Sequence, residues 1–118
     1  MRDTSIIFDH IHLISEDPHA AALWYVDKLG GEIVSSYDLR GAPQIHLAFS
    51  GTNIIIRGQR TDEQARKKNS QQWGVDHFGF QVPDDFDGFC DGLRHKGVTF
   101  TLEPMYFNPT TRIAYIGA

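Results

Sequence analysis

Two histidines occupy equivalent positions in two similar stretches of the sequence. Residues 8–15 are FDHIHLIS and residues 75–82 are VDHFGFQV, so that His10 and His77 each follow an aspartate and lie 67 residues apart. Such internal similarity at a fixed offset indicates a duplicated structural unit. Neutral imidazoles are ligands for iron, manganese, nickel, zinc or cobalt. The alternative is a pair of strand histidines that only form hydrogen bonds in a groove, and two at equivalent repeat positions favour the metal site.

Two further side chains are candidates for catalysis. His12 alternates with His10, so the two share one face of a strand, and His12 is a candidate base or further donor. The alternative for His12 is a polar residue that lines the site. Arg57 ends a predicted strand, where a guanidinium can bind a carboxylate or an enolate, although strand-end arginines are also common on surfaces.

Three side chains are candidates for substrate binding. His46 alternates with Gln44 and Ala48 on a predicted strand, and it faces the site in one of the two possible registers. Arg112 begins the last predicted strand and is a second candidate anion binder. Tyr106 lies in a segment bounded by prolines, where it either covers a substrate or packs over the open end of the sheet.

The elements that position these residues follow one order twice. In the first module (6–57), Asp17 and Pro18 begin a predicted helix, and Gly30 ends it. Alternating or β-branched runs predict strands around it. The predicted elements are a strand at 6–15, a helix at 17–28, and strands at 32–38, 44–49 and 52–57.

A polar connector, 58–74, precedes the second module, 75–118. This module begins with a strand at 75–82, followed by a helix that is capped by Asp84 or Asp85 and ends at Gly97. A strand at 98–103, a loop at 104–109 and a strand at 111–116 complete it. By the repeat, a fourth strand is expected after Ala118, and its absence from the sequence leaves an edge without a partner.

Composition limits the class of protein. The 118 residues suggest a single domain, 1–118, with ordinary hydrophobic and charged content. The net charge of −4 argues against a general nucleic-acid binder or a binder of anionic membranes. No apolar run approaches the ~18 residues of a membrane-spanning helix. The single cysteine, Cys90, fits a reducing, cytoplasmic location.

A duplicated βαβββ module in about 120 residues resembles the vicinal oxygen chelate superfamily, which includes glyoxalase I, methylmalonyl-CoA epimerase, extradiol dioxygenases, and bleomycin- and fosfomycin-resistance proteins. The matching stretches cover nearly the whole chain. They are Asp9 to Ile11, Tyr25 to Gly30, Val75 to Phe78 and Arg112 to Ile116. The resemblance implies an α+β fold in which two tandem βαβββ modules form a curved mixed sheet around a groove.

The resemblance also implies a metal site. In metal-using members, the histidine on the first strand of each module ligates a divalent ion, and those positions fall on His10 and His77. Two departures are visible. Glyoxalase-like members carry a glutamate on the fourth strand of the first module, where this chain has Asn53 to Arg57 without a carboxylate. The last family ligand, a glutamate, lies on the strand expected after Ala118. With that glutamate, the set of metal ligands is two histidines and one carboxylate, as in extradiol dioxygenases.

Three functions follow from the resemblance. The first is a metal-dependent enzyme whose small substrate chelates the metal through vicinal oxygens, with lyase, isomerase or ring-cleaving dioxygenase chemistry. The second is a non-catalytic, bleomycin-resistance-like binder, with which the aromatic Trp73, Tyr106 and Phe107 are compatible. The third is a metal-free module for dimerisation or regulation. Members of the superfamily often pair, and the unpaired edge favours a homodimer.

Overall fold

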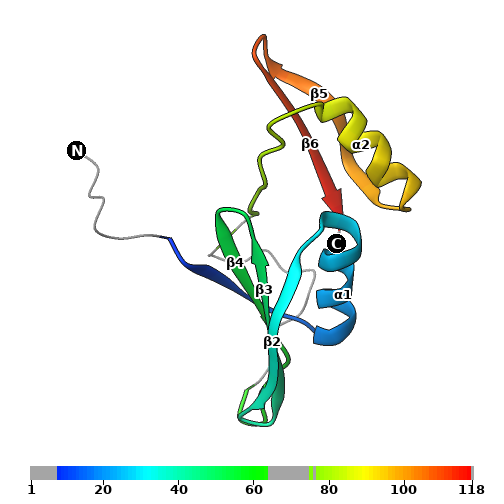
Figure 1. The fold of residues 1–118 in the computed structure, drawn as a ribbon. Coiled ribbons are helices and arrows are strands. Elements are labelled where there is room, and N and C mark those ends of the chain that lie inside the picture. The colour runs from blue at the N-terminus through cyan, green and yellow to red at the C-terminus, as the bar shows by residue number, and fades with distance from the viewer. Residues whose placement is uncertain (1–7, 64–74, 76, 118) are drawn as a thin grey trace, which may run out of the picture. The chain divides into compact units, whose positions relative to one another are not determined.

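The computed structural model describes residues 8–63, 75 and 77–117 and divides the chain into two compact units, 1–67 and 68–118. Each unit is described by itself (Figure 1). The connector residues 64–74, with Trp73, and Asp76 lie outside the described residues. The elements are β1 (His10–Ile14), α1 (Pro18–Leu29), β2 (Glu32–Leu39), β3 (Ala42–Phe49), β4 (Thr52–Arg57), α2 (Phe86–His95), β5 (Thr99–Asn108) and β6 (Thr111–Gly117).

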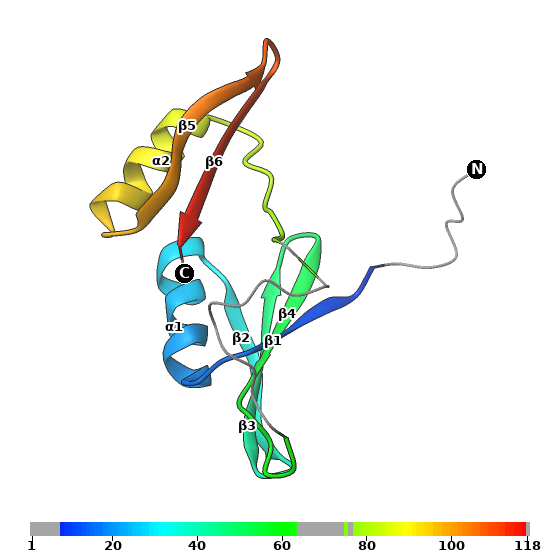
Figure 2. The ribbon, with the colours of Figure 1, turned by 180° about the vertical axis from the view of Figure 1, so that it is seen from behind.

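The first unit contains a four-stranded mixed sheet in the order β1-β4-β3-β2. β1 runs parallel to β4, whereas β3 is antiparallel to both β4 and β2. Figure 2 shows β1 beside β4. The sheet thereby brings the beginning of the unit next to its last strand. The α+β class predicted from the sequence is confirmed, whereas the tandem arrangement of two βαβββ modules stays a prediction.

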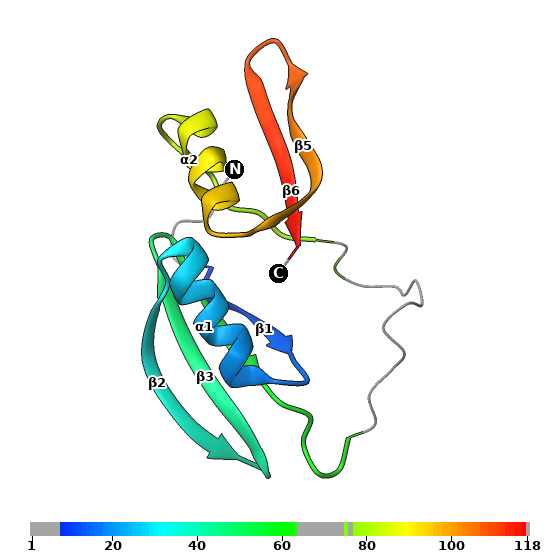
Figure 3. The ribbon, with the colours of Figure 1, turned by 90° about the vertical axis from the view of Figure 1, so that its right-hand side faces the viewer.

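The core of the first unit lies between α1 and the sheet. α1 contacts β2, β3 and β4 and lies along one face of the sheet (Figure 3). On the helix, Ala22 and Tyr25 are buried. The fully buried side chains of the central strands β3 and β4 are Ile45, Leu47, Ile54 and Ile56. Because side chains alternate along a strand, the residues between them must point to the opposite face.

Local sequence signals fix both ends of α1. The Asp17 carboxylate accepts a hydrogen bond of 3.1 Å from the backbone N–H of Ala20, which satisfies one free donor of the first turn. Pro18 follows as the first helical residue, where its missing N–H costs nothing. Gly30 ends the helix with φ of 74°, a left-handed conformation that favours glycine. The predicted helix at 17–28 is therefore observed within one residue.

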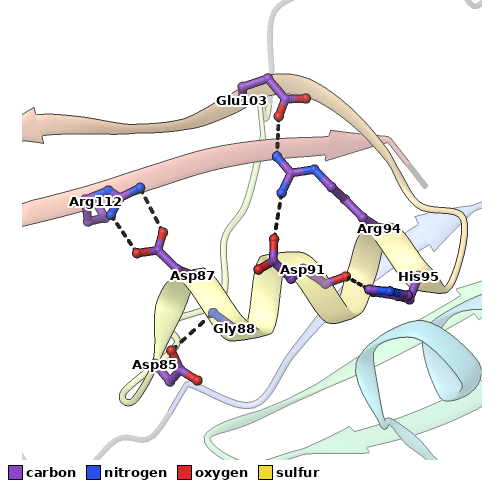
Figure 4. Close-up of polar contacts among 8 residues, drawn as sticks. All are labelled: Asp85, Asp87, Gly88, Asp91, Arg94, His95, Glu103 and Arg112. Atoms are coloured by element: carbon purple, nitrogen blue, oxygen red, sulfur yellow. Dashed lines mark hydrogen bonds and ion pairs between the residues drawn. The ribbon is translucent and has the colours of Figure 1, made fainter.

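In the second unit, α2 is joined to the antiparallel β5–β6 hairpin by ion pairs (Figure 4). Arg94 contacts Asp91 at 3.2 Å one turn away and also pairs with Glu103 on β5. Arg112 on β6 pairs with Asp87 on α2 at 2.9 Å. Leu93 and Cys90 supply the buried positions of the helix. Exposed pairs of this kind are screened by solvent and contribute little to stability.

The predicted strand at 75–82 is not observed. Val75 and residues 77–82 have no regular secondary structure in the part of the chain that the structure describes. In the first unit, β1 pairs only with β4. Among the strands that the structure describes, none pairs with 75–82. Alternating apolar residues do not form a strand without a neighbouring strand to accept their backbone hydrogen bonds.

The predicted loop at 104–109 is also wrong, because β5 continues through Pro104 to Asn108. The pairing of β5 with β6 shifts register between Leu102 and Met105. An irregularity of this kind tolerates a proline, which has no N–H to donate to the partner strand. The described strands form one sheet of four strands and one of two. No helix in the described part is long and apolar enough to span a membrane.

Candidate functional site

The face of the first sheet that α1 does not cover carries most of the candidate residues. His10 and His12 alternate with Ile11 on β1, and their rings lie 5.0 Å apart between centroids. In the sheet register His12 lies beside Ile55 of β4, and Ile55 lies beside His46 of β3. Residues in register on neighbouring strands point to the same face. His10, His12 and His46 therefore share this face, which we call the open face.

His10 is held by a carboxylate. Its Nδ1 lies 2.7 Å from Oδ2 of Asp9. A metal-ligating histidine commonly donates its second ring N–H to a carboxylate, which orients the ring and raises the basicity of the other nitrogen. The Asp9–His10 pair thus suits a metal ligand that binds through Nε2. Within residues 8–63, 75 and 77–117, however, no group of three or more His, Cys, Asp or Glu side chains is placed to hold a metal ion.

His12 has a lowered pKa. The largest cause is desolvation, because burial disfavours the charged imidazolium, and the smaller causes are the positive charges of His10, Arg57, Arg60 and His46. The neutral imidazole, which can accept a proton, is therefore favoured at position 12. Between His12 and His46 the sheet presents Ile55, whose exposed fraction is 6%. The open face is apolar at this point and polar on both sides.

Three hydrogen-bonding side chains meet at the other edge of the open face. The amide Nε2 of Gln44 donates to the Tyr37 hydroxyl at 3.1 Å and lies 3.3 Å from Nε2 of His46. The Tyr37 hydroxyl lies 3.2 Å from the same His46 nitrogen. Tyr37 and Gln44 are partners in the β2–β3 register, which explains why their side chains meet. The predicted candidate His46 is thus one member of a cluster of three.

Arg57 points to the open face but its guanidinium is already paired. Its Nη1 and Nη2 donate to the two carboxylate oxygens of Glu63 at 2.6 and 2.8 Å. Glu63 also accepts from the backbone N–H of Arg60 at 2.8 Å. These bonds lower the pKa of Glu63 to about 2, with the Arg57 hydrogen bond as the largest cause. The bidentate pair occupies the donors that were expected to bind substrate.

Replacing Glu63 by glutamine is expected to lower the stability of the fold at pH 5 and to make less difference at lower pH. The pKa of Glu63 falls from 4.5 to about 2 on folding, so its stabilising effect is full above pH 4.5 and is lost as the pH falls through 2. Urea unfolding of both proteins at pH 5, 3 and 2 measures this. Glu32→Gln on the exposed β2 strand is the control. An equal gap between Glu63→Gln and the wild type at all three pH values would contradict the pairing.

The second unit contains the remaining candidates. Arg112 donates to Asp87 at 3.1 Å, and its guanidinium carbon lies 4.6 Å from the ring centroid of Tyr106 and 5.5 Å from that of Phe86. The structure therefore brings together Arg112 and Tyr106, with the guanidinium paired to a carboxylate. His77 is exposed, and its ring centroid lies 5.4 Å from that of Tyr115.

Sequence reasoning missed three residues of the open face. Gln44 enters the sequence prediction only as a neighbour of His46 in the alternating pattern, which is the signal that places both on one face. Tyr37 becomes visible only through the β2–β3 register. Glu63 lies in the polar connector, where nothing in the pattern predicts its return to Arg57.

The fold is shared with solved structures of low sequence identity. A glyoxalase family protein from Enterococcus faecalis is 19% identical with a TM-score of 0.73, over 96% of this chain and 89% of that chain. A glyoxalase/bleomycin resistance protein/dioxygenase domain from Frankia sp. EAN1pec is 19% identical with a TM-score of 0.69, over 98% of this chain and 88% of that one. A third structure is an E126Q mutant of the fosfomycin resistance protein FosX from Listeria monocytogenes, complexed with Mn(II) and 1S,2S-dihydroxypropylphosphonic acid. It is 18% identical with a TM-score of 0.65, over 98% of this chain and 85% of that chain.

The family assignment depends on the sequence rather than on these structures, because likeness at such low identity shows the fold alone. No curated protein matches the sequence. A family profile, in contrast, matches residues 7–114, which include all the candidate residues described above. The chain belongs to the Glyoxalase/Bleomycin resistance protein/Dioxygenase superfamily.

Proposed function

We propose that the chain is a metal-dependent enzyme of the glyoxalase/dioxygenase type, whose small substrate chelates a divalent transition metal through two neighbouring oxygen atoms. The observation that supports this most directly is the 2.7 Å contact between Asp9 and Nδ1 of His10. It leaves Nε2 of His10 as the ligating nitrogen. His77 is the second proposed ligand. A carboxylate is the third ligand that the family resemblance implies.

The chemistry divides between the metal and the side chains of the open face. A bound divalent ion would supply Lewis-acid stabilisation of negative charge on the substrate or, as iron, activation of dioxygen. His12, with its ring 5.0 Å from that of His10, is the proposed group that accepts and returns the substrate proton. The guanidinium of Arg57 already binds Glu63, so the proposed role of Arg57 is to hold the edge of the site in place. Isomerase, lyase and ring-cleaving dioxygenase reactions are all compatible with this set.

Asp9→Asn is expected to weaken the binding of a divalent transition metal by about 10–100-fold, because the amide no longer offers His10 a charged partner. Calorimetric titration of the wild type and the variant with Zn²⁺ and Mn²⁺ measures the two affinities. Asp27→Asn on α1, an exposed aspartate that pairs with Lys28, is the control and should bind metal like the wild type. Equal affinities in the wild type and Asp9→Asn would overturn the proposed role of His10.

A non-catalytic small-molecule binder is the second candidate. It is favoured by the pairing of both candidate arginines, Arg57 with Glu63 and Arg112 with Asp87, which occupies guanidinium donors that catalysis would otherwise use. Metal titration also separates the two, because a binder of this kind needs no metal affinity. The homodimer and the cytoplasmic location expected from the sequence belong to the same proposal, and sedimentation velocity tests the first of them.

A further inference from the structure

Gln44 is buried at a position where an apolar residue would fit the fold better. It is the one buried polar residue in the part of the chain that the structure describes, with an exposed fraction of 6%. Its Oε1 is buried and has no hydrogen-bond partner among the described residues. A buried acceptor without a partner loses its hydration and gains nothing in return. Folding therefore does not explain why glutamine is present, and a functional reason is needed.

The effect of Gln44 is to hold two partly exposed groups. Its Nε2 donates to the Tyr37 hydroxyl and lies 3.3 Å from Nε2 of His46. The Tyr37 hydroxyl lies 3.2 Å from that same His46 nitrogen, and because the amide nitrogen of Gln44 can only donate, Nε2 of His46 is the acceptor in the cluster. The Tyr37 oxygen keeps one free lone pair, and its side chain is among the exposed aromatics of the sheet. The cluster thus offers an acceptor at the Tyr37 oxygen, held beside the His46 ring.

We infer that Tyr37 and His46 form a substrate-binding subsite positioned by Gln44, and that this subsite takes an uncharged hydroxyl group, that of an alcohol or a phenol. The inference deepens the proposed function, since it concerns the end of the substrate remote from the metal. An uncharged group is favoured because the cluster is built from an amide, a hydroxyl and an imidazole, with neither a carboxylate nor a guanidinium among them. Arg57 on β4 is in register with Gln44, and the positive charge of its guanidinium is already neutralised by Glu63.

The sheet geometry also indicates what lies between the hydroxyl group and the metal end of the substrate. His12 and His46 flank Ile55 in one row of three strands, so their Cα atoms are about 10 Å apart. The apolar Ile55 lies between them on the open face. A substrate that extends along this row needs an apolar middle portion, such as an aromatic ring, with the hydroxyl group at the far end.

Binding of small probes to the metal-free full chain tests the inference without depending on the metal. The probes are phenol, benzyl alcohol, benzoate and benzylammonium, and the readout is the ¹⁵N and ¹H signals of the histidine rings in NMR spectra. Phenol and benzyl alcohol are expected to shift the His46 signals, and the two charged probes are not. In Gln44→Leu and Tyr37→Phe the dissociation constant for phenol should rise about fivefold, as expected for the loss of one hydrogen bond.

Stability provides the second readout. Gln44→Leu should unfold at the same or a higher temperature than the wild type, because it removes the unpaired buried acceptor, whereas a merely structural glutamine would give a lower temperature. Gln81→Leu, an exposed position in the second unit, is the control for both measurements. A lower unfolding temperature in Gln44→Leu, shifts caused by benzoate but not by phenol, or unchanged phenol affinity in Tyr37→Phe would each overturn the subsite. A failure of metal binding would contradict the proposed metal site and not this subsite.

Discussion

Replacing Ile56 by alanine is expected to lower the free energy of unfolding by about 3 kcal/mol, and the unfolding temperature by roughly 10 °C or more. Ile56 has an exposed fraction of 0% and lies on β4, which has a partner strand on each side. Truncation removes three carbons from a close-packed interior, and the neighbours Ile54 and Ile45 cannot close the cavity without moving the strands that carry them. Chemical denaturation followed by circular dichroism measures the change.

The matched control is Ile14→Ala at the end of β1. The exposed fraction of Ile14 is 62%, so the same substitution there should change the free energy of unfolding by no more than about 0.5 kcal/mol. Both variants remove the same atoms from strands of one sheet, and only burial differs. If the two lose similar stability, the core of the first unit does not lie between α1 and the central strands.

Periodicity predicted the first unit well, because the contacts that stabilise it are local and signalled in the sequence. The Asp17 cap, the Gly30 terminus and the run from Ile54 to Ile56 each specify an element without reference to distant residues. The second unit was predicted less well. The predicted strand at 75–82 has no partner among the described strands, and a repeat pattern does not reveal whether a strand finds one. The predicted loop at 104–109 is wrong, because a register shift accommodates Pro104 within β5.

The candidate site was predictable to the extent that alternation places residues on one face. It placed His10 with His12, and His46 with Gln44. The alternation does not predict which groups a guanidinium contacts. The partner of Arg57 comes from the connector and the partner of Arg112 from α2, and both contacts depend on how segments return to the sheet. Strand-end arginines are therefore weak predictors of substrate binding, because a nearby carboxylate competes for the same donors.

His10→Ala and His77→Ala are each expected to weaken metal binding by more than about 100-fold, beyond the 10–100-fold cost of losing an outer partner such as Asp9. The reason is that each substitution removes a ligand rather than the group that orients it. Neutral imidazole bonds to a transition metal are only partly replaced by water. Metal titration of the full chain, with Zn²⁺ and Mn²⁺ added to protein freed of metal, measures each affinity.

His19→Ala on α1 and His95→Ala on α2 are the matched controls, because both are exposed histidines, one in each unit, and neither belongs to the proposed site. Loss of affinity in both test variants but in neither control would show that one imidazole from each unit binds the same ion. If His10→Ala reduces affinity and His77→Ala does not, the metal site belongs to the first unit alone, and the duplication has no part in it. Full affinity in both variants would remove the metal from the proposed function. The hydroxyl subsite at Tyr37 and His46 would then support the non-catalytic binder instead.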